Sequence, residues 1–400
     1  MTILFFSDNP WHSLYQRPQH LAARFSDVSP VLWIEPMTLG HRGHFAPEEV
    51  RPGIRAVSIP LLPHNARQRW VRGLSRILGS LPPVRWIELQ VQLLLLRRAL
   101  QKTRTDTGSV VLFLQNFQLI RLARKLKAPL LAFDYIDDAF GFTDFPAYVR
   151  ELWLETIRSA DVITVTSPTL NKIVREAAPG LALELHTVTN GVEFQKFAEK
   201  PSGPPSAGLP PEGTPLIGYV GSVYPWLDFE LLEEILTSFS SATLVLVGRE
   251  HPEVGEVLSR LRRYRNFLSL GTRPYDKVPG YLHRFNVGII PFRKTRLTAA
   301  VNPVKLYEYS ACGLPTVSTD FSNDLGEFAH LISVSHSHNE FIDNLHTAIE
   351  RKKDYAFIES LKRFARENDW DRKGSAIRTI MDNALAGRSS QDHHNAMRGT

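Results

Sequence analysis

The sequence has almost no cysteine, since Cys312 is the only one in 400 residues. A single cysteine excludes a disulfide framework and any metal site built from a cysteine cluster. Long apolar runs are missing as well, because the stretch Leu93–Leu96 is closed at once by Arg97 and Arg98. A membrane-spanning helix needs about 20 consecutive apolar residues, so the sequence predicts none.

The first residues lack the apolar core of a secretory signal. Ile3–Phe6 is apolar, but Asp8 and Pro10 follow closely, so the run is too short for a signal peptide. It indicates a buried first strand instead. Together with the low cysteine content, this favours a cytoplasmic location.

Charge and length narrow the possibilities further. The net charge of +6, with a sequence pI near 9.3, would suit anionic lipid, nucleotide phosphates or nucleic acid as partners. No recognised nucleic-acid-binding module is present, so we expect no nucleic acid partner. A chain of 400 residues is too long for one ordinary core and predicts two domains.

Short apolar runs alternate with amphipathic stretches along the chain, which predicts a doubly wound α/β architecture. The expected strands share a buried, non-alternating pattern typical of parallel sheets. They are Ile3–Ser7, Pro30–Ile34, Val110–Leu114, Pro129–Phe133, Asp161–Thr166, Leu216–Val220, Ala242–Val247, Phe267–Leu270, Val287–Pro291 and Pro315–Ser318. The expected helices are Arg17–Phe25, Gln115–Lys125, Ala147–Ser159, Phe229–Phe239 and Val304–Ala311.

One segment breaks this alternation. Residues 200–215, KPSGPPSAGLPPEGTP, are too rich in proline and glycine for a helix or central strand. We expect a linker there, between domains at 1–199 and 216–368. A terminal helix is expected over 370–386, capped near Asp369, and the polar tail 387–400 is expected to be disordered.

Several segments occur in an order that resembles the GT-B glycosyltransferases. The resemblance is greatest to the group 4-like bacterial enzymes of surface polysaccharide synthesis. The segments are WHSLYQRPQHLA (11–22), SADVITVTSP (159–168), IGYVGS (217–222), LVLVGR (244–249), NPVKLYEYSACGLPTV (302–317) and Trp370-Asp371. The resemblance implies two Rossmann-like domains facing across a cleft. The first would bind an acceptor and the second a nucleotide-sugar, and the terminal helix would pack back on the first.

Gly221 and Ser222 follow an expected strand and precede a helical stretch. A glycine there lets backbone N–H groups approach a diphosphate, although a tight turn would explain it equally. Family members often carry a basic residue in this loop, whereas here residues 223–226 are VYPW. The phosphate charge would then fall to Lys305, or to Arg249 after the next strand.

Lys305 and Glu308 are three residues apart and would share one helix face. Asn302, Pro303 and Val304 begin that helix, so its positive end would face the ligand crevice. The resemblance implies that Lys305 holds phosphate and Glu308 accepts hydrogen bonds from the ribose hydroxyls. The alternative is a surface ion pair.

Two further positions bear on the donor. Thr272 and Arg273 lie in a loop where the resemblance places the nucleobase, with Tyr275 available to stack on it, although an exposed loop is the alternative. Retaining relatives carry a glutamate seven residues before the ribose glutamate, and here that residue is Val301. The absence of this glutamate favours inversion of the configuration at the anomeric carbon.

The first domain offers candidates for acceptor activation. Asp137 and Asp138 end an expected strand, where an open α/β sheet binds ligands, and either could act as general base. A helix cap or an ion pair with arginine is the alternative. His20 is a rival base, and Gln16 and Arg17 are expected to line the same crevice on the acceptor side.

The segment from His64 to Arg104 is both basic and apolar. Its apolar residues Trp70, Val71, Leu74, Ile77 and Leu78 share a helical face, opposite Arg69, Arg72 and Arg76. This pattern favours docking on an anionic membrane, and hence a peripheral position on the inner face of the plasma membrane. The alternative is that the apolar face packs into the first domain.

These observations predict an enzyme that transfers a sugar from a nucleoside-diphosphate donor, UDP favoured, to a lipid-linked or saccharide acceptor. A nucleotide-sugar 2-epimerase of the same fold and a non-catalytic sugar-binding protein are the alternatives. No cofactor or metal is expected. Asp369-x-Asp371 indicates a helix cap rather than a metal site, and the scattered histidines form no convincing one.

Overall fold

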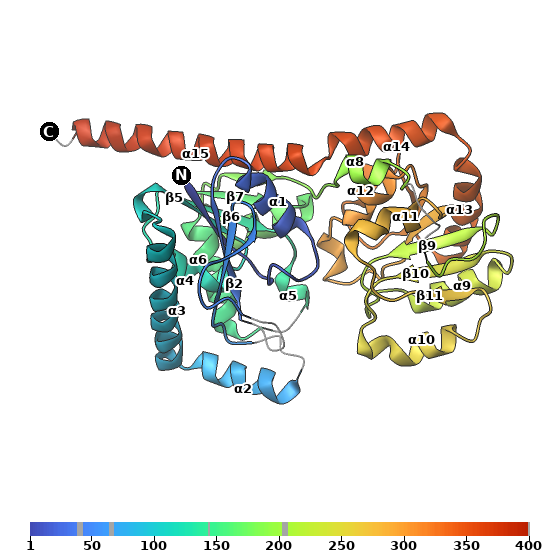
Figure 1. Ribbon diagram of the computed structural model, residues 1–400, viewed down its shortest axis with the longest axis horizontal. Coiled ribbons are helices and arrows are strands. Elements are labelled where there is room, and N and C mark those ends of the chain that lie inside the picture. The colour runs from blue at the N-terminus through green and yellow to red at the C-terminus, as the bar shows by residue number, and fades with distance from the viewer. Residues whose placement is uncertain (38–42, 64–67, 143–144, 202–206, 399–400) are drawn as a thin grey trace. The chain divides into compact units, whose positions relative to one another are not determined.

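The computed structural model describes residues 1–37, 43–63, 68–142, 145–201 and 207–398 (Figure 1). Of residues 389–398 and Phe142 it describes the backbone. The chain forms two compact units. Unit 1 comprises Met1–Thr189 and Lys373–Thr400, and unit 2 comprises Asn190–Arg372.

Among the described residues, unit 1 carries a sheet of eight strands in the order β3-β4-β2-β1-β5-β6-β7-β8. All neighbours are parallel except β3 and β4. The strands are β1 (Thr2–Phe6), β2 (Val31–Pro36), β3 (Glu48–Arg51), β4 (Ile54–Ile59), β5 (Val110–Leu114), β6 (Leu130–Tyr135), β7 (Val162–Val165) and β8 (Leu185–Thr187). The central strands β2, β5 and β6 are buried at every residue, as apolar parallel strands covered on both faces should be.

Helices cover both faces of this sheet. They are α1 (Arg17–Ser26), α2 (Arg69–Ser80), α3 (Pro82–Thr103), η1 (Thr107–Ser109), η2 (Phe117–Leu119), α4 (Ile120–Arg124), α5 (Ala139–Phe142), α6 (Ala147–Ser159) and α7 (Pro168–Ala177). Helix α3 packs on β4 and α4, and α4 packs on α6. Helix α2 adjoins the N-terminal end of α3 and extends beyond the sheet (Figure 1).

The described part of unit 2 carries a wholly parallel sheet of six strands in the order β11-β10-β9-β12-β13-β14. The strands are β9 (Leu216–Val220), β10 (Thr243–Val247), β11 (Phe267–Ser269), β12 (Val287–Ile290), β13 (Thr316–Thr319) and β14 (Ser333–Ser335). One apolar core, which includes Tyr219 and Tyr309, extends through both sides of this sheet.

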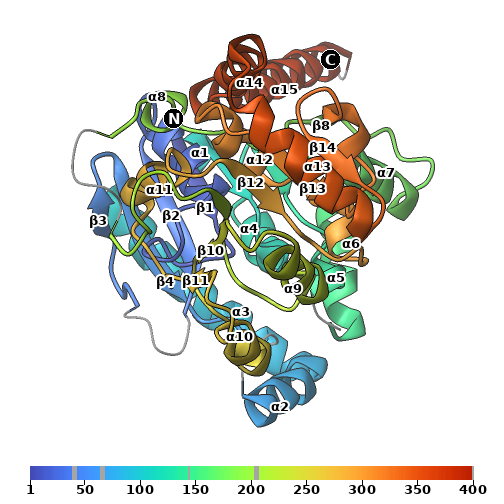
Figure 2. The ribbon, with the colours of Figure 1, turned by 90° about the vertical axis from the view of Figure 1, so that its right-hand side faces the viewer.

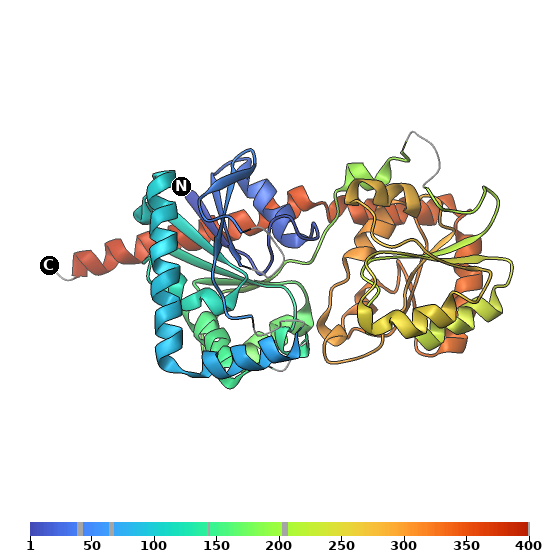
Figure 3. The same ribbon diagram turned by 60° about the horizontal axis from the view of Figure 1, so that its bottom comes forward.

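Three helices of unit 2 begin at residues suited to capping. Asp228, Ser337 and Asp354 each accept a hydrogen bond from a backbone N–H in the first turn of the helix that follows. Figures 2 and 3 show α9 and α10 on one face of the sheet, with α11 and α12 on the other. The helices are α8 (Phe194–Ala198), α9 (Phe229–Ser238), η3 (Pro252–Val254), α10 (Gly255–Leu261), η4 (Tyr275–Lys277), α11 (Val278–Leu282), η5 (Thr298–Ala300), α12 (Val304–Ala311), η6 (Leu325–Phe328), α13 (His338–Arg351) and α14 (Tyr355–Glu367).

The predicted α/β architecture with two doubly wound units is confirmed. Strands β3, β8 and β14 were not expected, since they are short and partly exposed and lack the buried apolar pattern. Strand β4 was not expected either, because Arg55 and Ser58 interrupt its apolar residues, although five of its six residues are buried. The division between the units falls at Thr189 and Asn190. Residues 190–199 therefore belong to unit 2, because Phe194 and Phe197 of α8 lie in its core. Of the expected linker, residues 202–206 lie outside the described part.

The terminal helix α15 (Trp370–Arg398) begins in unit 2 and belongs to unit 1 from Lys373 onward. A Cβ on Gly374 would lie 2.8 Å from the Arg24 Cβ atom, so α15 and α1 are in close contact there. The helix continues to Arg398, beyond residue 387, where the polar tail was expected to begin. Residues 388–398 contain no proline or glycine that would end it. None of the helices in the described residues combines the length and apolarity that a membrane crossing requires.

Candidate functional site

The strand order of unit 2 reverses between β9 and β12, and we call the region at the carboxyl ends of these two strands the crevice of unit 2. These neighbouring strands are parallel, and the chain leaves β9 towards β10 but leaves β12 towards β13, on opposite sides. Open α/β sheets bind their ligands at such a reversal of strand order. The residues that follow β9 and β12 are therefore the first candidates for a ligand site.

Gly221 follows β9 in a conformation that side chains rarely adopt, with a φ of +144°. A Cβ there would lie 2.6 Å from both Cε and Nζ of Lys305. Gly248, which follows β10, has a φ of +156°, and its Cβ would meet the Gly221 carbonyl oxygen at 1.9 Å. Both glycines are thus required by close approach, and the one at 221 leaves room for the lysine.

Lys305 lies on the first turn of α12 and reaches into this crevice. Its Nζ atom is 5.1 Å from the centre of the Tyr219 ring and 5.2 Å from that of Phe292, residues that flank the ends of β9 and β12. Loss of hydration lowers the pKa of the ammonium group to about 8, although Glu308 opposes the shift. A partly buried cation between two aromatic rings is ready to receive an anion.

Glu308 follows one turn later on α12 and is 9% exposed. Burial raises its pKa to about 7, while Lys305 lowers it and Glu193 raises it. Within the described residues its carboxylate accepts no hydrogen bond. A buried carboxylate without donors can still accept hydrogen bonds from a ligand's hydroxyl groups.

The residues that begin α12 have a structural task. The Asn302 side-chain oxygen accepts hydrogen bonds from the Asn190 backbone N–H at 2.9 Å and the Tyr307 hydroxyl at 3.0 Å. Its backbone carbonyl accepts a third from the Asn190 side chain at 2.8 Å. Pro303 is the N-cap, and Val304 is the half-buried first residue of the helix. Asn302 thus fixes the start of α12, and with it the position of Lys305.

Two predicted residues lie beside the glycine loop. Arg249 follows Gly248 and is exposed, and its guanidinium makes no ion pair within the described residues. Its carbonyl accepts a hydrogen bond from the Val223 N–H at 2.9 Å, which ties the loop after β9 to the loop after β10. Ser222 is half-buried, and its carbonyl accepts a bond from Tyr219 at 2.9 Å.

The predicted nucleobase loop is largely engaged with unit 2 itself. Arg273 donates to the Tyr281 hydroxyl at 3.0 Å and to the carbonyl of Thr272, whose own side chain is exposed. The Tyr275 ring lies 5.6 Å from that of Phe197, and the Lys196 ammonium sits over it at 4.4 Å. Tyr275 already has packing partners, so the structure gives no particular support to base stacking there.

In unit 1 the corresponding reversal of strand order falls between β1 and β5. Arg17 is the first residue of α1, the helix that follows β1. Its side chain is 3% exposed and donates to both carboxylate oxygens of Asp134, at 2.9 and 2.8 Å. Gln115 and Thr164 also donate to that carboxylate, at 2.8 and 2.6 Å. Arg17, predicted to face an acceptor, is therefore one partner of a buried charge pair.

The other two predicted residues of this segment differ in exposure. Gln16 is exposed at the N-cap of α1, and its backbone N–H donates a hydrogen bond to the Gln19 side-chain oxygen at 3.1 Å. His20 is 2% exposed, with its ring packed against Tyr15 at 4.6 Å and near the Arg24 guanidinium. Such burial suits a core histidine better than a base that meets an acceptor in solvent.

The paired aspartates after β6 have different surroundings. Asp138 is 4% exposed and accepts bonds from the Phe140 N–H at 3.2 Å and the Tyr135 hydroxyl at 3.4 Å, so it caps α5. Asp137 is half-buried and accepts no hydrogen bond within the described residues. Burial raises its pKa to about 7, Arg17 lowers it, and Asp138 raises it. Of the two, Asp137 is the better candidate for a general base.

Asp8 is a candidate that the sequence analysis missed. It follows β1, at the reversal of strand order, and it is exposed. Surrounding protein atoms and the negative charge of Asp137 raise the pKa of its carboxyl group. Its position after the first strand was the available signal, because it shares the carboxyl edge of the sheet with Asp137.

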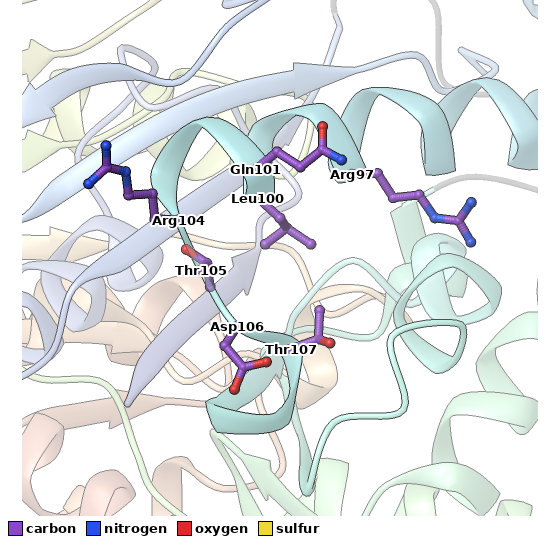
Figure 4. Close-up of a pocket in the computed structure, with 7 residues that line it drawn as sticks. All are labelled: Arg97, Leu100, Gln101, Arg104, Thr105, Asp106 and Thr107. Atoms are coloured by element: carbon purple, nitrogen blue, oxygen red, sulfur yellow. The ribbon is translucent and has the colours of Figure 1, made fainter.

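Three other features do not contribute to the candidate sites at the carboxyl edges of the two sheets. A hollow of about 420 Å³ lies at the end of α3, where Leu100 occupies the middle and the guanidinium groups of Arg97 and Arg104 point apart (Figure 4). No group of three or more His, Cys, Asp or Glu in the described part could hold a metal ion. Asp369 accepts bonds from the N–H groups of Asp371 and Phe194, at 2.7 and 2.8 Å, so it acts as a cap.

Known proteins resemble this chain in sequence and fold. Residues 214–351 match the family described as glycosyl transferases group 1. A putative teichuronic acid biosynthesis glycosyltransferase, TuaH of Bacillus subtilis (strain 168), is 26% identical over 226 residues. That match covers 56% of this chain and 57% of TuaH, so it spans little more than half of either protein.

Solved structures match over nearly the whole chain. A trehalose-6-phosphate structure from E. coli, bound with UDP-2-fluoro glucose, has a TM-score of 0.65 at 12% identity, covering 95% of this chain and 99% of the other. A trehalose-6-phosphate synthase, studied for glycosyl transfer with retention, has a TM-score of 0.68 at 13% identity, covering 95% and 99%. The chain therefore has the GT-B fold, and its residues 214–351 form a glycosyl transferases group 1 domain.

Proposed function

We propose that this chain is a glycosyltransferase that moves a sugar from a nucleoside-diphosphate sugar, UDP favoured, to a lipid-linked or saccharide acceptor in surface polysaccharide synthesis. One observation carries the proposal. The Lys305 ammonium occupies the crevice at the ends of β9 and β12, where Gly221 leaves space for it. Glu308 lies one turn further along the same helix.

The diphosphate of the donor is the group that this crevice suits. Lys305 supplies a positive charge that is already partly desolvated, so less hydration is lost when phosphate arrives. The first turn of α12 adds N–H groups and the positive end of the helix dipole. In the proposed reaction this charge neutralises the leaving diphosphate, and no metal ion is needed for that task.

Glu308 would select the nucleoside part of the donor. Its carboxylate can accept hydrogen bonds from two ribose hydroxyl groups, and burial strengthens such bonds. The UDP-2-fluoro glucose bound to the E. coli protein of the same fold is consistent with a uridine donor. The name of TuaH, a teichuronic acid glycosyltransferase, is the support for a cell-surface polysaccharide as product.

We propose that Asp137 activates the acceptor. It would take the proton from the acceptor hydroxyl as that oxygen forms its bond to the anomeric carbon. The bond from that carbon to the diphosphate oxygen breaks, and the electron pair leaves with the nucleoside diphosphate. A pKa near 7 suits a base that must be deprotonated at neutral pH and yet accept a proton.

This single displacement would invert the anomeric configuration. Support comes from Val301, which stands where the resemblance to retaining enzymes places a glutamate. The synthase studied for glycosyl transfer with retention shares the fold at 13% identity, which leaves the stereochemistry of this chain to experiment.

Incubation with a panel of UDP- and GDP-sugars, followed by chromatography of the nucleotides, tests the proposal. We expect release of UDP, slowly to water and faster with an acceptor extract, and its loss in Lys305→Ala. An epimerised nucleotide-sugar without UDP release would indicate the 2-epimerase instead. Activity lost on addition of EDTA and restored by Mg²⁺ would contradict the metal-independent mechanism.

A further inference from the structure

Helix α2 presents its apolar side to solvent. Trp70, Leu74 and Ile77 are exposed by 72%, 48% and 66% of their surfaces. The residues of this helix that the protein buries are Ser75 and Gly79. A helix that packs its small residues inward and its large apolar residues outward is arranged for contact with something outside the described fold.

The positions of the arginines agree with this orientation. Arg72 and Arg76 are half-buried, as are Val71 and Leu78. Arg69 is exposed beside Trp70. The alternative expectation, that the apolar face packs into the first domain, is therefore wrong for Trp70, Leu74 and Ile77.

The exposed apolar stripe continues onto α3. Leu81 and Trp86 are exposed, followed by Ile87, Val91 and Leu94. The last three are spaced four and three residues apart, so they share one face of the helix. The opposite face, which includes Leu93 and Leu96, is buried in unit 1. We call the exposed apolar residues of α2 and α3, with the neighbouring basic residues, the α2–α3 surface.

Positive charge accompanies the apolar residues. Residues 69–104 contain eight basic residues and one acidic residue, Glu88, so their net charge of +7 exceeds the +6 of the whole chain. Glu88 is half-buried, and its carboxylate accepts a hydrogen bond from the Leu62 N–H at 2.8 Å. Arg97, Arg98 and Lys102 are exposed on α3. The surface is thus cationic as well as apolar.

We propose that the α2–α3 surface docks on an anionic lipid bilayer, such as the cytoplasmic leaflet of a plasma membrane. Exposed tryptophan and aliphatic side chains enter the boundary between headgroups and acyl chains, and arginine and lysine contact lipid phosphates. The 12 residues of α2 extend about 18 Å, less than the hydrocarbon core, so α2 lies along the interface.

A second copy of the chain fits this surface less well than a bilayer does. A two-fold interface would bring the same patch of each copy together, and with it two segments of net charge +7. Like charges brought together in this way oppose association. An anionic bilayer supplies the opposite charge and an apolar layer at once.

Flotation of the full chain with vesicles tests the proposal. The probes are vesicles of phosphatidylcholine with and without phosphatidylglycerol, at low and high salt. We expect binding that requires phosphatidylglycerol and weakens with salt. Arg69→Gln/Arg97→Gln/Arg98→Gln should weaken the partition coefficient about a hundredfold, from the usual contribution per basic residue. Trp70→Ser/Ile77→Ser should weaken it at least about tenfold.

The controls remove exposed residues of the same kinds, arginine and aromatic, from unit 2. Arg263→Gln/Arg265→Gln removes two exposed arginines of unit 2, and Tyr355→Ser removes an aromatic ring that is 85% exposed. Both should float like the wild type, and circular dichroism should show all variants folded. The proposal is overturned if the wild type does not bind, or if the controls lose as much. It is also overturned if light scattering shows a dimer that Trp70→Ser/Ile77→Ser dissociates.

Discussion

The two units have the same kind of sheet, but the polar residues at their carboxyl edges are used differently. In unit 2, Lys305 and Glu308 lie one turn apart on α12, and neither side chain makes a hydrogen bond within the described residues. In unit 1, Arg17 is bound to a buried aspartate and Asp138 caps a helix. Asp137 remains available at the edge of unit 1.

This difference shows when local sequence suffices to identify a site. Lys305 and Glu308 share a face because they are three residues apart, so the sequence alone relates them. Arg17 and Asp134 are 117 residues apart and meet only through the fold. A polar residue at a sheet edge can bind a ligand or form contacts within the protein. In unit 1, Arg17 and Asp138 form contacts within the protein.

The largest expected effect distinguishes the two aspartates that follow β6, Asp137 and Asp138. Asp137→Asn should lower turnover by about 10²–10⁴, because the amide cannot accept the acceptor's proton. UDP affinity should stay unchanged, since Asp137 belongs to unit 1. Asp138→Asn should lower turnover much less, because its carboxylate caps α5. Initial rates with a saturating donor measure both.

The anomeric configuration of the product sharpens this test. Nuclear magnetic resonance of the product should show inversion relative to the donor. A retained configuration would refute the general-base mechanism even if Asp137→Asn were inactive. Near-normal turnover of Asp137→Asn would move the role of base to Asp8.

The next effect concerns stability rather than catalysis. Arg17→Met should lower the free energy of unfolding by about 3–5 kcal/mol, because it leaves the Asp134 carboxylate buried without its cationic partner. Arg158→Met, which removes an exposed arginine of unit 1, should change it little. Urea unfolding followed by circular dichroism compares the two. A stable Arg17→Met protein that fails only with acceptor would show that Arg17 is a ligand.

Most of the architecture could be predicted because apolar runs such as Val110–Leu114 are buried on both faces and have no alternative use. Helix α12 was predicted at its observed bounds from Asn302-Pro303 at its start and Gly313 at its end. Strands β3 and β14 lie at sheet edges and carry too few apolar residues to be recognised.

The site was predicted less completely, for physical reasons. The sequence could not show that the Asn302 side chain would accept a hydrogen bond from Asn190, which lies 112 residues away. Nor could it show the strand order, in which β5 alone separates β1 from β6, so that the charge of Asp137 affects Asp8. The direction in which α2 faces was equally hidden, because its pattern is amphipathic either way.

A smaller effect, tied to pH, separates the two edges. Lys305 has a lowered pKa of about 8, so it loses its charge above that pH, and UDP affinity should fall by up to about tenfold per pH unit. Glu308 has a raised pKa of about 7 and becomes protonated below it, so affinity should decline there as well. Lys305→Arg stays charged and should lose the alkaline decline.

Turnover should depend on pH through the other unit. Asp137 must be deprotonated to act as base, and its pKa of about 7 predicts that turnover falls below that pH. Asp8→Asn removes a like charge, so it should shift this acid limb to lower pH. An unshifted limb would show that the two carboxylates do not interact.

Isothermal titration calorimetry of UDP tests the central claim, that the α12 crevice of unit 2 binds the nucleoside diphosphate. The wild type should bind UDP, and Lys305→Ala and Glu308→Ala should each weaken binding by about tenfold to a hundredfold, as expected for a charged hydrogen bond. Lys353→Ala, which removes an exposed lysine of unit 2, and Asp137→Asn should bind as the wild type does. Unchanged affinity in both α12 variants would contradict the account.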